Sequence, residues 1–256
     1  MKSSSYFRIK ESGCEIFSFN NVCILKQSDT GKVYQTTNKE LVALAQTKGT
    51  PENEAISDRS WWAYVIVLSV SVFSACLLTM YIAFTYKIYI TWNILWKVGA
   101  YSLSQMFLHE GAHYLALRLF GRKPDCAGIK INYYIFPAFY IRMNDVNLLH
   151  KRQKFTVHSS GVLANCITNN IVLAYAMHQQ SWNLIVVACW FGIGILWNAI
   201  PLLDSDGYKA LLAILSEQQT KDKRNNCQII KTINTINIIV VIIYILYYLI
   251  LLARMM

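Results

Sequence analysis

Two histidines and a glutamate near the middle of the chain have the spacing of a metal-binding motif. The segment Leu108-His109-Glu110-Gly111-Ala112-His113-Tyr114 reads His-Glu-x-x-His inside an apolar stretch. Residues four apart lie on one face of a helix, so both imidazoles could reach one Zn²⁺, with Glu110 beside it to accept a proton from water. Two core histidines and a buried glutamate are the simpler alternative. In a membrane, however, an ionisable group is costly unless it is paired or binds a metal, which favours a zinc site.

The composition is that of a membrane protein. Of the 256 residues, 55% are hydrophobic and 15% are charged, whereas a soluble domain carries about 25% charged residues. The net charge of +10 does not indicate nucleic-acid binding, because Lys and Arg fall mainly between apolar runs, where they mark cytoplasmic loops. We therefore expect a lipid bilayer as a partner, and no nucleic acid.

The cysteines and the N-terminus give little further information. Seven scattered cysteines without a Cys-x-x-Cys pair predict reduced structural thiols rather than a disulfide or metal framework. Residues 1–58 are mixed and polar, so no cleavable signal peptide is expected there. Membrane insertion should therefore depend on internal segments.

Five apolar runs are long enough to cross the hydrocarbon core, which takes about 20 residues of helix. They cover roughly Trp61–Tyr86, Trp92–Phe120, Phe155–Met177, Trp182–Leu203 and Ile229–Leu252. The expected fold is an all-α polytopic membrane protein with about five transmembrane helices. The second of these carries the His-Glu-x-x-His sequence in its later half.

Ahead of this membrane domain, at 59–256, residues 1–58 are expected to form a small cytoplasmic region. Alternating stretches such as Glu15–Phe19 and a turn signal at Asp29–Lys32 predict a few strands, and Asn38–Lys48 predicts one helix. Two roles remain open for this region, a peptide-recognition module and a packing extension.

The connection from about Gly121 to Lys154 is strongly basic. Within it, Ile131–Ile141 is too short and too aromatic for a span, so we expect a hairpin or a re-entrant piece at the membrane surface. The basic loops place the N-terminus in the cytoplasm and the C-terminus outside. The histidine pair then lies near the cytoplasmic face.

A catalytic zinc usually has three protein ligands and an open fourth position, so a third ligand is needed. His150, His158 and His178 read as ordinary loop or span-border residues. A carboxylate is the better candidate, from Asp204-Ser205-Asp206-Gly207 after the fourth apolar run. There, Pro201 interrupts the helix and Gly207 would allow a sharp turn. The alternative is that these aspartates cap the next helix, 207–215, which we favour for Asp204.

Three motifs together resemble the site-2 protease family of intramembrane zinc metalloproteases. Its members carry His-Glu-x-x-His on one span, Gly-x-x-x-Asn on the next and Asn-x-x-Pro-x-x-x-x-Asp-Gly on the one after. This chain has His109 to His113, then Gly161 and Asn165, then Asn198, Pro201, Asp206 and Gly207. The resemblance covers about residues 93–215, implies a three-helix core and selects Asp206 over Asp204 as the ligand.

A tighter resemblance is to the peptide zinc metalloproteases encoded beside bacterial gene clusters for ribosomally made, modified peptides. Two positions depart from the pattern, since Ala112 stands where many relatives have Gly and no proline follows Gly161, but neither is a ligand. The matching stretches are Leu119–Pro124, Phe136–Tyr140, Asn144-Asp145, Arg152-Gln153 and Asp206–Tyr208.

The resemblance and the spacing together imply one Zn²⁺ per chain, held by His109, His113 and Asp206. Glu110 would be the general base for water attacking a peptide carbonyl. Asn165 would donate to the developing oxyanion or the substrate backbone, although a hydrogen bond between spans would explain it as well. Asn198 is expected to be structural, bonding backbone groups freed near Pro201.

The expected function is therefore intramembrane zinc metallopeptidase activity, in the cell membrane of a bacterium. Its substrate would be a small peptide or a single-span membrane protein, and peptide-modifying or export proteins are candidate partners. One alternative is regulated proteolysis of a membrane-held transcription regulator. Another is a non-catalytic immunity or export protein that binds peptide without cutting it. The stretch Tyr133–Ile141 could present a strand edge to an extended substrate.

Overall fold

The computed structural model describes residues 6–11, 13–19, 22–52, 56–86, 92–132, 136–201, 205–216 and 227–239, except for the side chains at 130–132 and 136–138. Two compact units share the chain. The first contains Met1–Ser69 and Leu103–Gly161, and the second contains Val70–Ser102 and Val162–Met256. Each is described by itself.

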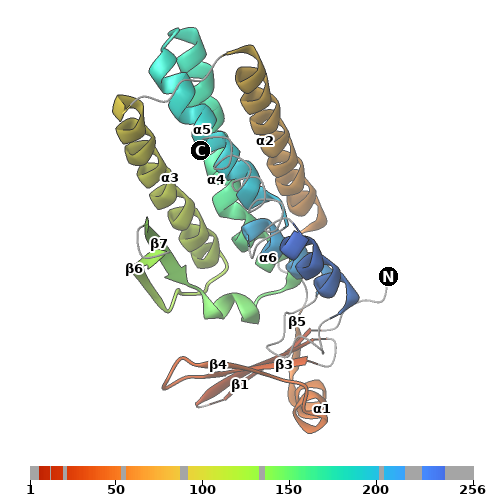
Figure 1. Cartoon of the computed structure of the whole chain (residues 1–256). Coiled ribbons are helices and arrows are strands. Elements are labelled where there is room, and N and C mark those ends of the chain that lie inside the picture. The colour runs from red at the N-terminus through yellow and green to blue at the C-terminus, as the bar shows by residue number, and fades with distance from the viewer. Residues whose placement is uncertain are drawn as a thin grey trace. The chain divides into compact units, whose positions relative to one another are not determined.

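The first unit begins with an antiparallel five-stranded sheet of order β4-β3-β2-β1-β5 (Figure 1). The turn expected at Asp29–Lys32 joins two of its strands, and Gly31 adopts the left-handed backbone (φ +64°) that favours glycine there. The strands expected in the N-terminal region are therefore confirmed. Their bounds are β1 (Tyr6–Glu11), β2 (Cys14–Phe19), β3 (Val22–Gln27), β4 (Val33–Thr36) and β5 (Thr50–Glu52).

Successive residues of a strand point to opposite faces of the sheet, and this sheet has apolar residues on both faces. Each face is therefore covered by another part of the unit. One face packs on α1 (Lys39–Lys48) through Val42 and Ala45. The other face buries Phe17, Ile24 and their neighbours against Leu148. The helix expected at 38–48 is confirmed, with Asn38 as its N-cap accepting from the Glu40 N–H at 2.8 Å.

Four long helices occupy the regions expected to be apolar spans. They are α2 (Asp58–Thr85), α3 (Trp92–Leu119), α4 (Lys151–His178) and α5 (Trp182–Ala199), followed by the short α6 (Asp206–Leu215). A further helical stretch covers 228–239, and the rest of the fifth expected span lies outside the described residues.

The expectation of about five spans is not confirmed. Among the described helices, α2 and α5 are long and apolar enough to cross a membrane, but α3 and α4 do not meet this test. The difference has a chemical cause, because α3 carries Gln105, His109 and Glu110 and α4 carries Asn165, Asn169 and Asn170 within its length. The chain is mainly helical, as expected, with strands that an all-α description leaves out.

The stretch expected as a hairpin or re-entrant piece is a β-hairpin of β6 (Cys126–Asn132) and β7 (Phe136–Arg142), which lies beside α3 in Figure 1. Its residues 133–135 lie outside the described part. Phe139 fixes β7 to α3, since its ring centroid is 3.8 Å from that of Phe107 and its N–H points at Met106 Sδ at 3.3 Å. The hairpin therefore packs one turn before the histidine motif.

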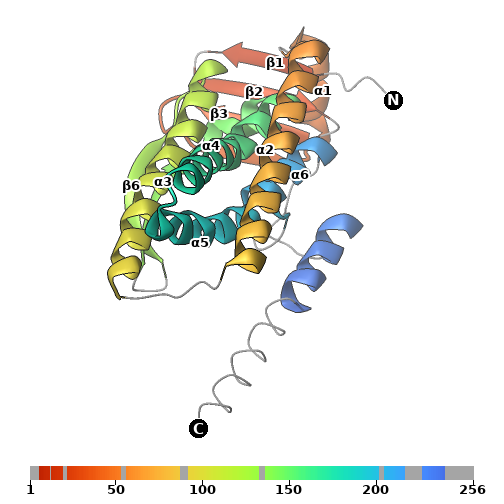
Figure 2. The same cartoon turned by 90° about the horizontal axis from the view of Figure 1, so that it is seen from above.

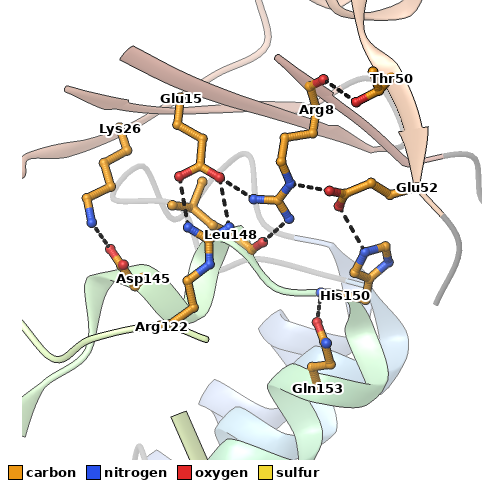
Figure 3. A network of polar contacts seen from close by, with 10 residues as sticks. All are labelled: Arg8, Glu15, Lys26, Thr50, Glu52, Arg122, Asp145, Leu148, His150 and Gln153. Atoms are coloured by element: carbon orange, nitrogen blue, oxygen red, sulfur yellow. Dashed lines mark hydrogen bonds and ion pairs between the residues drawn. The ribbon is translucent and has the colours of Figure 1, made fainter. Parts of the chain in front are cut away.

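Charged residues of the sheet bind the segment that follows α3, the helix with His109 and His113 (Figure 3). The Glu15 carboxylate accepts two hydrogen bonds from Arg122, both at 2.8 Å, and another from Arg8. Burial would raise the pKa of Glu15, but the two arginines outweigh it and lower the pKa to about 2. Glu15 is thus ionised and holds the segment after α3 against the sheet.

The same network reaches the start of α4. Glu52 accepts from Arg8 Nε at 2.6 Å and lies 3.2 Å from His150 Nε2. Lys26 pairs at 2.5 Å with Asp145 of the 3-10 turn η1 (Asn144–Leu148). The sheet therefore holds both ends of the connection between α3 and α4.

The second unit has its own apolar core between helices. The later part of α4 lies beside α5 (Figure 2), where Leu173 and Ala176 pack on Ile185 and Ala188. Near this core, Tyr101 of α3 donates a hydrogen bond to Asn169 of α4 at 2.9 Å.

Candidate metal centre

His109 and His113 face each other on α3, as their spacing predicts. Their Nε2 atoms are 3.1 Å apart, and the side chains are 8% and 3% exposed. Two nitrogens that bind one tetrahedral zinc at 2.0–2.1 Å would be about 3.3 Å apart. The pair therefore fits the geometry of two ligands to a single zinc ion.

The tautomer of His113 follows from its neighbour on α4. His113 Nδ1 is 2.6 Å from the backbone oxygen of Val157, and Ser160 Oγ is 3.3 Å from the same nitrogen. A carbonyl oxygen can only accept, so Nδ1 carries the proton and donates it. His113 Nε2 is left with a lone pair, as a metal ligand requires.

Asp206 is the first residue of α6 and is 9% exposed. Asn198, in the last turn of α5, binds it at two points. Asn198 Nδ2 donates to Asp206 Oδ2 at 3.0 Å, and the Asp206 N–H donates to Asn198 Oδ1 at 3.1 Å. Asn198 was expected to form hydrogen bonds with backbone groups freed near Pro201. It also donates a hydrogen bond to the carboxylate of Asp206, the candidate ligand.

Two details of this turn differ from expectation. Ser205, rather than an aspartate, caps α6 by accepting from the Tyr208 N–H at 3.1 Å, and Asp204 lies outside the described residues. Gly207 does not provide a sharp turn, since it lies in α6 and is absent from the residues with positive φ. Glycine is needed there for space, because a Cβ would lie 2.1 Å from the backbone oxygen of Ala199.

His109 and His113 of the first unit and Asp206 of the second are all buried, and each side chain offers one atom of a kind that binds metal ions. That the three bind one ion together stays a prediction. The chemistry of the set fits zinc, which takes imidazole nitrogen and carboxylate oxygen. Glu110 is half-buried on α3, and Asn165 is buried on α4. Their catalytic roles stay predictions.

Of the remaining histidines, His150 has contacts that agree with a structural interpretation. His150 stacks edge-on against Tyr6, with ring centroids 4.2 Å apart, and faces Glu52. Sequence reasoning did not find Val157 and Ser160 as neighbours of His113. A backbone carbonyl leaves no signal in a sequence, and serine is common in helices of every kind.

Comparison with known proteins gives one relative. The chain is 34% identical over 148 residues to "Putative peptide zinc metalloprotease protein YydH" of Bacillus subtilis (strain 168). The match covers 57% of this chain and 59% of that protein. No protein-family model and no solved structure matches the chain. The match agrees with the expected resemblance to peptide zinc metalloproteases, and the site-2 protease assignment stays a prediction.

Proposed function

We propose that this protein is a zinc metallopeptidase that cuts a peptide bond in a small peptide or a single-span membrane protein, at or within a membrane. The observation that carries this proposal is the pair of Nε2 atoms 3.1 Å apart, together with a backbone acceptor that fixes the His113 tautomer. The relative's name, a peptide zinc metalloprotease, points to the same chemistry.

The ligand set in this proposal is His109, His113 and Asp206. A zinc ion bound there would supply Lewis acidity and lower the pKa of water. Glu110 takes a proton from the attacking water and returns it to the leaving nitrogen. Asn165 donates to the oxygen of the substrate carbonyl as negative charge develops on it. Asn198 keeps the Asp206 carboxylate in one orientation through the two hydrogen bonds described above.

The membrane location is supported by composition and by two helices, α2 and α5. We place the N-terminus in the cytoplasm and the site near the cytoplasmic face, because the connection between α3 and α4 is rich in Lys and Arg. Reporter fusions at residues 58, 89, 180 and 220 test this orientation, since a periplasmic reporter active at 58 would contradict it.

The decisive comparison is between the wild type and Glu110→Gln. Both proteins should bind close to one zinc per chain, measured by metal analysis of the purified protein. Peptides from cells with each form should differ by a cleavage product that mass spectrometry finds only with the wild type. A third strain with His113→Ala should lose both zinc and product.

The two alternatives give different results in the same experiment. A non-catalytic peptide-binding protein would leave the peptides of the Glu110→Gln strain identical to those of the wild-type strain. Regulated proteolysis would give a fragment of a membrane-held regulator instead of a processed small peptide.

A further inference from the structure

Gly161 of α4 faces the nitrogens of the histidine pair. A Cβ atom on Gly161 would lie 2.5 Å from His113 Nε2, 2.5 Å from His109 Cε1 and 2.6 Å from His109 Nε2. Contacts below 3.0 Å require one partner to move. Any side chain at this position would therefore press on the two atoms that would bind the ion.

The backbone of α4 does not itself need glycine at this position. Gly161 lies within a regular helix and is not among the residues with positive φ. In such a place glycine costs about 1 kcal/mol relative to alanine. The benefit that offsets this cost is space beside the histidines.

Two other helical glycines, Gly99 and Gly194, have no close neighbour of this kind. A Cβ on Gly99 of α3 or on Gly194 of α5 would meet nothing within 4 Å. These two positions are therefore matched controls, since each exchanges glycine for alanine in a long helix without a steric contact.

One turn of α4 contacts both nitrogens of a single imidazole. Val157 O accepts from His113 Nδ1 at 2.6 Å, and Gly161, four residues later, lies against His113 Nε2. Because the two contacts lie at the two different nitrogens of the ring, they fix both its tautomer and its position. Ser160, which lies 3.3 Å from Nδ1, adds a third contact from the same turn.

We propose that Gly161 is a positioning residue of the metal centre. It lets α4 pass directly against the two Nε2 atoms and keeps them free to bind a cation. This inference rests on the proposed zinc site and adds a requirement to it, because the ligands function only while residue 161 has no side chain. A methyl group there displaces the rings and separates the two nitrogens.

The test uses the purified full-length chain and Co²⁺ as a visible substitute for zinc. We expect the wild type and Gly99→Ala to give the same visible cobalt absorption and affinity. We expect Gly161→Ala to bind Co²⁺ and Zn²⁺ at least 10-fold more weakly and to give an altered cobalt spectrum. Equal affinity and equal spectra for the two variants would overturn the inference.

Two further results separate this inference from the proposed function and from misfolding. A wild-type chain that binds neither metal overturns the proposed function and this inference together. If Gly161→Ala does not fold, nitrogen NMR of histidine-labelled wild type provides the test, with His113 identified by His113→Asn. The proton should be on Nδ1 in the metal-free chain, and a proton on Nε2 would contradict the role of the α4 turn.

Discussion

Asn198 holds Asp206 by two hydrogen bonds, one to its carboxylate at 3.0 Å and one from its backbone N–H at 3.1 Å. Helix α5 ends shortly before Pro201, so the two residues belong to different helices, α5 and α6. This pairing defines the orientation of the candidate carboxylate ligand within its own unit.

Asn198→Ala should weaken zinc binding by about 10–100-fold, because the Asp206 carboxylate loses the hydrogen bond from Asn198 that helps to orient it. The affinity is measured by competition with a chelator of known strength. Asn170→Ala is the matched control, since the Asn170 amide bonds Ser71 and Ser74 rather than Asp206. An equal loss in both variants would mean that Asn198 acts only through general stability.

Gly207→Ala should destabilise the protein by about 1–3 kcal/mol, because its Cβ would overlap the backbone oxygen of Ala199. The measurement is denaturant unfolding of the metal-free protein. Gly194→Ala, where a Cβ meets nothing within 4 Å, should be neutral or slightly stabilising. A neutral Gly207→Ala would show that the close contact between α6 and the end of α5 is not needed.

Phe139→Ala should reduce cleavage while zinc stoichiometry stays the same. The ring of Phe139 lies 3.8 Å from that of Phe107 and fixes β7 to the histidine helix. Removing an aromatic pair costs about 0.5–1.5 kcal/mol, enough to loosen the hairpin without unfolding it. Full activity of this variant would count against a strand edge that receives substrate at this hairpin, and Phe139→Tyr should keep activity. The same hypothesis applies to Phe136, whose side chain is outside the described part.

The stability of the first unit should fall in acid because of Glu15. Its folded-state pKa of about 2 is below the ordinary 4.5, so its stabilising effect is complete above pH 4.5 and disappears as the pH falls towards 2. The expected loss is about 2 kcal/mol, after allowing for partial exposure of the pair. Unfolding measured from pH 6 to pH 2 checks it.

Glu15→Gln should be less stable at neutral pH and should lose much of this acid dependence, because Arg8 and Arg122 keep their charge without a carboxylate between them. Glu11→Gln, a change on the exposed end of β1, should keep the wild-type acid dependence. Similar profiles for both variants would show that other carboxylates cause the acid sensitivity.

Local patterns predicted the elements that depend on local physics. Alternating apolar residues predicted the N-terminal strands, and apolar runs predicted the four long helices. They did not predict whether each helix crosses a membrane, because polar groups on α3 and α4 reduce their apolarity. They also did not find the network around Glu15, whose partner Arg122 is 107 residues away.

The sequence by itself determined the facing histidines, because a helix of 3.6 residues per turn places residues four apart on one face. It also determined which residue types could bind zinc, and Pro201 indicated an interruption of the helix, although the fourth apolar run was expected to extend to Leu203 and α5 ends at Ala199. Only the tertiary structure decided that Val157 fixes the tautomer of His113, that Gly161 leaves room for the nitrogens and that Asn198 orients Asp206. These contacts require packing between helices, and His113 and Val157 are 44 residues apart. No periodicity along a chain encodes the distance between two atoms on different helices.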